Sequence, residues 1–223
     1  MHTKLAVMLA CVVMGVVAVL WLWPFAESGG EVSKAPGPVP TVVLPKSKIG
    51  FRYDTVLYLF AKAGESLASD SVIPPCDESF EYCIYRTSEG YAGTNFSTAG
   101  LRITQRTDLT EEEACTGTEP AGYSGLAVKR RGGEGYSVSV FGPRTGAAAG
   151  QRSFSAVYRL FTKGYCYEFE ARVAESQFEN YPAGTIERFT SAEREIVYSG
   201  LVDILTTTSR EGSSVPIVYP SLD

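Results

Sequence analysis

Short runs in which apolar and polar residues alternate recur through most of the chain. A period of two, in segments rich in Tyr, Phe, Val and Ile, is typical of β-strands with one buried face. The pattern predicts strands at 49–54, 56–61, 80–86, 100–106, 125–130, 136–142, 156–162 and 165–173. Because these strands follow one another with few helices between them, we expect an antiparallel sheet.

Two further segments carry the signals of helices. Thr110 with Glu113, and Thr190 with Glu193, have the spacing of a capping box. Beyond Thr190 the apolar positions form two adjacent i, i+4 rows. These rows are Val197, Leu201 and Leu205, and Ile196, Gly200 and Ile204. The stripe predicts a carboxyl-terminal amphipathic helix packed on one face of the sheet, so the expected fold class is α+β.

The sequence FTKGYC predicts a tight hairpin. Its two-residue turn is Lys163 and Gly164, because such turns need positive φ angles. Opposed positions in this hairpin then sum to 327. One face carries aromatic and aliphatic residues, whereas Arg159, Glu168 and Glu170 share the other. Arg159 lies opposite Glu168, and we expect a structural ion pair on a solvent-exposed face, worth under about 1 kcal/mol.

The two glutamates also allow a catalytic alternative. Glu168 and Glu170 lie two positions apart on one strand, which places their α-carbons roughly 7 Å from each other. Glycoside hydrolases use two carboxylates at a comparable separation. A carboxylate-dependent hydrolase acting on envelope polysaccharide is therefore the alternative function, and it requires Arg159 to point away from Glu168.

The four cysteines beyond residue 25 predict two disulfides, the usual outcome for an even number in an exported chain. Four cysteines allow three connectivities. We favour Cys76 with Cys83, which closes a short loop, and Cys115 with Cys166. The second bond would hold the segment near Cys115 against the hairpin.

Composition excludes several kinds of chemistry. His2 is the only histidine, so the folded part has no Ser-His-Asp or Cys-His arrangement and no His-ligated zinc. Close CxxC pairs are missing too, and we expect neither a metal nor a cofactor. After Lys4 the chain has 19 Lys and Arg against 25 Asp and Glu, and its longest basic run is KRR at 129–131. A nucleic-acid partner is therefore not expected.

The amino-terminal residues 5–25 contain no charged side chain. As a helix, this segment would be about 31 Å long, the thickness of the hydrocarbon core of a bilayer. Lys4 precedes the segment and Glu27 and Glu31 follow it. We therefore expect a transmembrane signal-anchor helix, with residues 1–4 in the cytoplasm and the rest of the chain outside.

Two alternatives to a permanent anchor remain. A cleaved signal peptide would use Ala26 and Ser28 as small residues at the cut, and it would export the domain as well. A lipoprotein modified at Cys11 is the other alternative, although it leaves the apolar run after Cys11 unexplained. A pilin-like subunit is excluded, because prolines follow the apolar segment where that helix would have to continue.

The rest of the chain divides by composition. Residues 26–47 are rich in Gly and Pro and are interpreted as a linker. Residues 48–208 are expected to form the extracytoplasmic α+β domain, and residues 209–223 a flexible tail. Within the domain, the glycine-rich segment 142–153 is interpreted as a mobile connection between strands.

Three stretches carry a resemblance. They are IPPCDESFEYCIYRTSEGYAGTNFSTAGLRITQRTDL, YRLFTKGYCYEFEAR and NYPAGTIERF. Over roughly residues 48–207, the chain resembles uncharacterised exported or membrane-anchored proteins of small-genome uncultured bacteria. The resemblance implies a bacterial exported α+β domain and transfers no catalytic residue.

Together these expectations describe a bacterial single-pass membrane protein with a non-enzymatic binding module outside the cell membrane. Its partner would be an envelope component, another protein or a small molecule. The hydrolase is the alternative from a different class. A purely structural domain that assembles on the membrane is the third possibility.

Overall fold

The computed structural model describes residues 40–46, 48–67, 71–76, 79–126, 128–210 and 215–221. All of them belong to one compact unit, Val39–Asp223. The expected cytoplasmic residues and signal-anchor helix, and most of the expected linker, lie outside the described residues. Within the described ranges, no helix has both the length and the apolar character needed to cross a bilayer.

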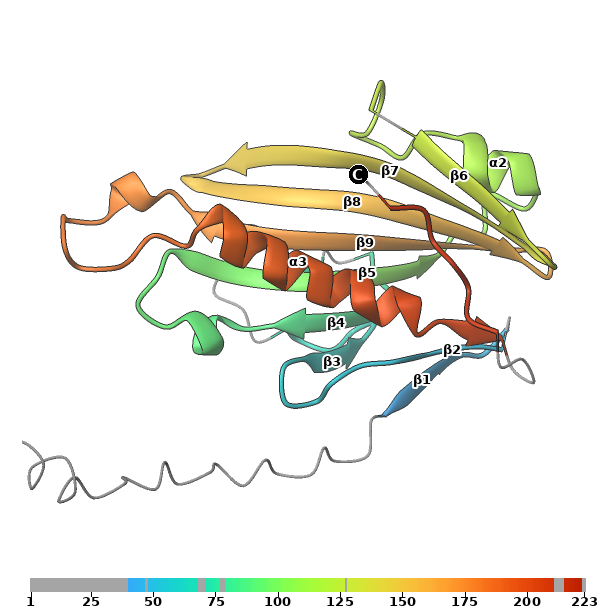
Figure 1. Ribbon diagram of the computed structural model, residues 1–223, viewed down its shortest axis with the longest axis horizontal. Helices are drawn as coiled ribbons and strands as arrows, with labels where there is room; N and C mark the ends of the chain where they lie inside the picture. The colour runs from blue at the N-terminus through green and yellow to red at the C-terminus, as the bar shows by residue number, and fades with distance from the viewer. Residues whose placement is uncertain are drawn as a thin grey trace, which may run out of the picture. The chain divides into compact units, whose positions relative to one another are not determined.

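Seven antiparallel strands form the main sheet (Figure 1). Their spatial order is β3-β4-β5-β9-β8-β7-β6. Their bounds, in chain order, are β3 Leu59–Lys62, β4 Tyr82–Arg86, β5 Phe96–Gln105, β6 Val128–Gly133, β7 Tyr136–Ala148, β8 Gln151–Thr162 and β9 Tyr165–Ser176. Each strand pairs antiparallel with its neighbours. The expected antiparallel sheet and α+β class are therefore confirmed.

A smaller sheet has three strands in the order β1-β2-β10. They are β1 Thr41–Leu44, β2 Ile49–Arg52 and β10 Ser209–Arg210. The helices are α2 Glu112–Gly117 and α3 Ser191–Thr206, and two 3-10 turns lie at Ser88–Tyr91 and Phe178–Asn180. The alternation pattern predicted every one of these strands except β1 and β10, the two partners of β2.

Both ends of the folded unit extend beyond their expected limits. Strand β1 lies within the segment interpreted as a linker, and its Leu44 is fully buried. Near the other end, Ile217 is buried and donates its backbone N–H to the carbonyl of Thr208 at 2.8 Å. The described part of the expected flexible tail is thus packed against the domain, because it has apolar side chains that can fill the core.

The segment expected to be a mobile connection is mostly β-strand. Strands β7 and β8 run through it and are joined at Ala149 and Gly150, whose φ angles are 47° and 76°. Two successive positive φ angles are the signature of a type I′ hairpin turn. The turn joining β8 to β9 has the same form, with φ of 51° at Lys163 and 78° at Gly164. That hairpin has the register predicted from its sequence.

Helix α3 covers one face of the sheet, where it lies across β9 and β5 (Figure 1). Its capping box at Thr190 and Glu193 is present as predicted. The buried side chains of the helix are Val197, Leu201, Ile204 and Leu205. Ile196 is 66 % exposed, so the second predicted row is only partly buried. The helix packs against aromatic and aliphatic residues of the sheet to form the main core.

The other face of the sheet is covered by short irregular segments. Disulfides join Cys76 to Cys83 (S–S 1.96 Å) and Cys115 to Cys166 (S–S 2.04 Å), which is the connectivity we favoured. They attach a segment before β4, and helix α2, to strands of the sheet. The capping box predicted for α2 at Thr110 is wrong, because the helix begins one residue later, with Glu111 at the N-cap and no side-chain cap.

Candidate functional sites

Two hollows, one on each face of the sheet, are candidates for a functional site. The first contains the glutamates singled out by the sequence. Side chains of alternate strand residues share a face, so Glu168 and Glu170 of β9 both point away from α3. Arg159 of β8 lies directly opposite Glu168, and Arg102 of β5 lies opposite Glu170 on the other side.

The ion pair between Arg159 and Glu168 is present, but it does not face water. Nη2 and Nε of Arg159 lie 2.8 Å and 2.9 Å from Oε2 of Glu168. Arg159 is 0 % exposed and Glu168 is 5 % exposed. The expectation of a solvated pair is therefore wrong. The reason is the cover that α2 provides, since Nη1 of Arg159 also donates to the carbonyl oxygens of Cys115 and Thr118.

Burial changes how much this ion pair matters for the stability of the fold. Desolvation lowers the pKa of Arg159, and the hydrogen bond and charge of Glu168 oppose that effect. Arginine still remains charged in proteins. A buried charge that loses its partner costs about 3–5 kcal/mol, whereas an exposed pair contributes under about 1 kcal/mol. The pair thus belongs to the interior of the domain.

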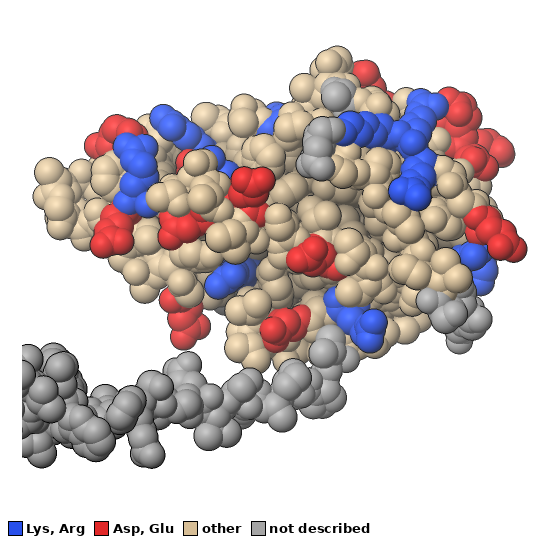
Figure 2. All heavy atoms as spheres, viewed as in Figure 1, with Lys and Arg blue, Asp and Glu red and all other residues tan. Residues whose placement is uncertain are grey.

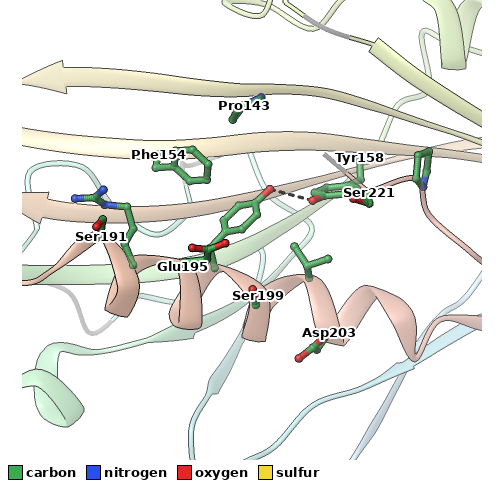
Figure 3. A pocket seen from close by; sticks show the side chains of 12 residues that line it. Pro143, Phe154, Tyr158, Ser191, Glu195, Ser199, Asp203 and Ser221 are labelled. Atoms are coloured by element: carbon green, nitrogen blue, oxygen red, sulfur yellow. Dashed lines mark hydrogen bonds between the residues drawn. The ribbon is translucent and has the colours of Figure 1, made fainter. Parts of the chain in front are cut away.

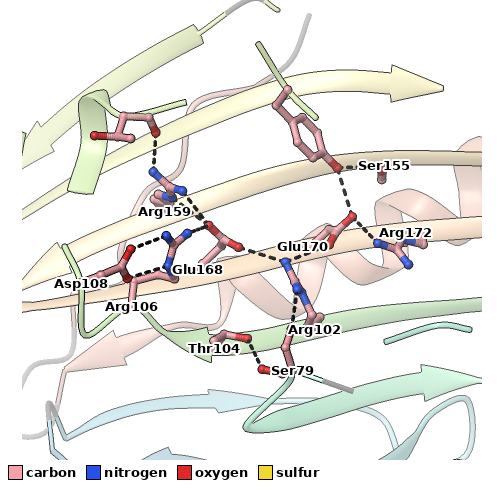
Figure 4. A network of polar contacts seen from close by, with 12 residues as sticks. Ser79, Arg102, Thr104, Arg106, Asp108, Ser155, Arg159, Glu168, Glu170 and Arg172 are labelled. Carbon is pink, nitrogen blue, oxygen red and sulfur yellow. Dashed lines mark hydrogen bonds and ion pairs between the residues drawn. The ribbon is translucent and has the colours of Figure 1, made fainter. Parts of the chain in front are cut away.

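Three further arginines complete the network around the two glutamates (Figure 4). Arg102 Nη2 lies 2.9 Å from Glu168 Oε1 and 3.0 Å from Glu170 Oε2. Arg106 Nη1 lies 2.9 Å from Glu168 Oε2, and Arg172 Nη2 lies 2.7 Å from Glu170 Oε1. All four carboxylate oxygens therefore lie within 3.0 Å of an arginine nitrogen. This occupancy is unfavourable for a nucleophile or general base, which needs an accessible lone pair.

Tyr123, which lies over the polar face of the sheet, also contacts this network. Its hydroxyl lies 2.7 Å from Ser155 Oγ and donates to Glu170 Oε1 at 3.2 Å. Burial is the main cause that raises the pKa of Tyr123, and the charge of Glu170 adds to it. The hydroxyl therefore stays protonated and acts as a hydrogen-bond donor at neutral pH.

A cavity of about 420 Å³ opens beside this network, and we call it the arginine cavity. Its lining combines charged residues with a few small and apolar ones. It is formed by Ser79, Arg102, Thr104, Arg106, Pro120, Ala121, Tyr123, Arg144, Val157, Glu168, Glu170 and Arg172. Arg159 faces Glu168 and not the open space, so the condition set for the hydrolase alternative is not met.

The second hollow, which we call the α3 groove, measures about 470 Å³. It lies between helix α3 and the parts of β7 and β8 that the helix leaves uncovered (Figure 3), and Pro220 and Ser221 complete its lining. The sequence pattern does not predict this groove, because the groove depends on where α3 crosses the sheet.

Aromatic side chains form the floor of the α3 groove. The rings of Phe154 and Tyr198 pack edge to face with centroids 4.9 Å apart. The hydroxyls of Tyr158 and Tyr198 lie 2.9 Å apart (Figure 3). Burial raises the pKa of both tyrosines. The floor therefore offers half-buried ring surface together with hydroxyl groups that stay neutral.

The helix side of the α3 groove is polar. Ser191, Glu195, Ser199 and Asp203 line it, and all four are exposed. Arg194 also lines the groove, but its guanidinium makes a bidentate ion pair with Glu175, at 2.7 Å and 2.8 Å. Over the face that carries α3, acidic and basic side chains are interspersed with uncharged surface (Figure 2).

These features define an α+β domain with a helix on one face of an antiparallel sheet and a buried charge network on the other. No known protein family matches the chain, and no curated protein is significantly similar to it. The case for a function therefore rests on the two hollows.

Proposed function

We propose that the protein is a membrane-tethered, extracytoplasmic, non-enzymatic binding module, and that its ligand occupies the α3 groove. Two disulfides favour an oxidising compartment. The apolar residues 5–25 have the composition and length of a membrane anchor. An apolar hollow with a few convergent polar groups is the usual form of a ligand site.

The chemistry of the α3 groove favours a neutral saccharide of the cell envelope as the ligand. Sugar rings present apolar C–H faces, which pack on aromatic side chains such as Phe154 and Tyr198. Their hydroxyl groups donate hydrogen bonds that the carboxylates of Glu195 and Asp203 can accept. An acidic polysaccharide would meet these two carboxylates as like charges. The proposal rests on one observation, namely that an aromatic floor and an acidic rim lie next to each other in one groove of about 470 Å³.

Ligand-observed NMR tests this proposal. The full chain, in micelles of a sugar-free and phosphate-free polyoxyethylene detergent, is mixed with neutral oligosaccharides of several linkages. We expect saturation transfer to at least one of them. The variant Glu195→Ala should weaken the transfer, whereas Ile196→Ala, an exposed neighbour that does not line the groove, should leave it unchanged. Absence of transfer with every oligosaccharide, from a folded protein, would overturn the proposal.

The hydrolase alternative has a separate test. If Glu168 and Glu170 were catalytic, the full chain would release reducing ends from envelope polysaccharide, and Glu170→Gln would abolish the release. We expect no release above the level of a buffer control, because arginines occupy every oxygen of the two carboxylates. Release that depends on Glu170 would establish the enzyme.

A further inference from the structure

The arginine cavity has more positive than negative charge. Four arginines and two glutamates line it, which leaves a formal excess of two positive charges among the described lining residues. Arg159 and Asp108, which contact this network from outside the cavity, add one charge of each sign. The glutamates therefore neutralise only part of the guanidinium charge, and an anion can supply the rest.

Of the four arginines that line the cavity, Arg144 is the one that contacts neither Glu168 nor Glu170. Its guanidinium lies over the ring of Tyr123, with Cζ 5.5 Å from the ring centroid. It forms no ion pair with any residue in the described part of the chain. Gly122 adopts a φ of 79°, and a side chain there would collide with this guanidinium. The chain thus leaves room for Arg144 to lie beside Tyr123 at the wall of the cavity.

A second arginine lies in register with the first. The pairing of β7, β8 and β9 puts Arg144, Ser155 and Arg172 in one row across the three strands. Adjacent strands are about 4.8 Å apart, so the α-carbons of the two arginines are on the order of 10 Å from each other. Arg172 donates from Nη2 to Glu170 and from Nη1 to the carbonyl of Pro74. Its Nε has no hydrogen-bond partner among the described residues.

These positions suit a tetrahedral oxyanion. Guanidinium groups bind phosphate through paired N–H donors, and two arginines that flank an anion hold it more strongly than one does. The remaining wall includes Pro120, Ala121 and Val157, which offer apolar contacts to the organic part of a small ester. A cavity of about 420 Å³ has the size of small-molecule sites.

We propose that the arginine cavity binds a phosphate group, held between Arg144 and Arg172. The group belongs either to free inorganic phosphate or to a small phosphomonoester. This site lies on the face of the sheet opposite α3, and it does not depend on saccharide binding in the α3 groove. Glu168 and Glu170 hold the arginines in place there and do not act on the ligand.

Isothermal titration of the full chain, in the same polyoxyethylene micelles, tests the site with inorganic phosphate and glycerol 3-phosphate. Glycerol and sodium chloride serve as blanks. We expect saturable binding with one site per chain, which weakens as ionic strength rises. Stronger binding of glycerol 3-phosphate than of phosphate would identify the ester as the ligand class, and equal affinities would identify the free anion.

The variant Arg144→Gln should weaken binding by about tenfold or more, because it removes a charged donor. Its side chain is exposed, so the fold should survive, and an unchanged thermal midpoint confirms this. Arg188→Gln is the matched control, since Arg188 is 55 % exposed and pairs with Glu179 away from the cavity. Two results would overturn the proposal: no binding of either phosphate compound, or binding that Arg144→Gln leaves intact.

Discussion

Glu168 is the residue on which the buried positive charges most depend. It accepts from Arg102, Arg106 and Arg159, and the last of these is fully buried. Glu168→Gln would leave Arg159 without its counter-charge, and we expect a loss of about 3–5 kcal/mol in the free energy of unfolding. Urea denaturation measures this loss.

The control for Glu168→Gln is an exposed ion pair. Glu113 and Arg130 lie 3.1 Å apart, and their side chains are 83 % and 47 % exposed. Glu113→Gln should change the free energy of unfolding by less than about 1 kcal/mol. Equal losses in the two variants would mean that burial of the Arg159 pair has no energetic consequence.

Gly100 tests how tightly the segment before β4 lies on the sheet. A β-carbon at this position would be 2.7 Å from Cβ of Pro75 and 3.0 Å from its carbonyl oxygen. The neighbouring Cys76 is tied to β4 by its disulfide, so the segment cannot easily move away. We expect Gly100→Ala to lower the free energy of unfolding by about 1–3 kcal/mol.

Gly132 in β6 is the matched position for this substitution. A β-carbon there would have no atom within 4 Å, and its φ angle is not in the left-handed region. Gly132→Ala should be neutral or stabilising, by up to about 1 kcal/mol, because alanine restricts the unfolded chain. If both alanine variants were neutral, Pro75 could not be packed against Gly100.

At the scale of elements, the contact between α3 and β8 should show in the response to alkali. Burial raises the pKa of Tyr158 and Tyr198 above the value near 10 that they have when unfolded. The folded state therefore retains protons that the unfolded state releases above pH 10. The contribution of these tyrosines to the free energy of unfolding is fully present below pH 10. It falls as pH rises further, by up to about 1.4 kcal/mol per pH unit for each such group.

Urea denaturation between pH 8 and pH 11 measures this slope. We expect Tyr198→Phe to make it shallower, since the variant has one fewer group that titrates only after unfolding. A slope that Tyr198→Phe does not alter would indicate that Tyr198 titrates normally in the folded protein.

Elements could be predicted where one short stretch carries the whole signal. The turn at Lys163 and Gly164 and the capping box of α3 are examples, because both depend on neighbouring residues. The segments that cover the polar face of the sheet, where Glu168 and Glu170 lie, could not be predicted. Segments 71–76 and 118–126 have no periodicity, and one of the disulfides beside them joins cysteines 51 residues apart. Without that cover, alternation alone indicated a solvent-exposed face.

The charge network was predictable only within its hairpin. Arg159 and Glu168 lie on strands that a two-residue turn joins, so their pairing follows from the register of that hairpin. Arg102 also lies in a predicted strand, but its contact with Glu170 depends on β5 lying next to β9. These strands are distant in sequence, and nothing in either one identifies its neighbour. The α3 groove was missed for a similar reason, since it depends on the path of a helix across the sheet.

At the scale of the whole molecule, the proposed membrane anchor at residues 5–25 can be tested directly. With an epitope after Asp223, the full chain expressed in bacteria should resist alkaline carbonate extraction from membranes. External protease should remove the epitope from spheroplasts. The intact mass should include residues 1–25, because a signal-anchor, unlike a signal peptide, is not removed.

A variant with Val16→Arg and Leu20→Arg separates anchoring from folding. An arginine at the centre of a membrane helix costs about 2.5–3.5 kcal/mol of insertion free energy, and Val16 lies next to the centre of residues 5–25. The chain should then stay in the reducing cytoplasm, where the cysteine pairs of the folded unit remain thiols that react with a maleimide. In the unaltered chain these four cysteines should be protected as disulfides, so that Cys11 alone reacts after denaturation. A carbonate-soluble product that lacks residues 1–25 would instead identify a cleaved signal peptide, and protected thiols in the double variant would contradict export as the source of the disulfides.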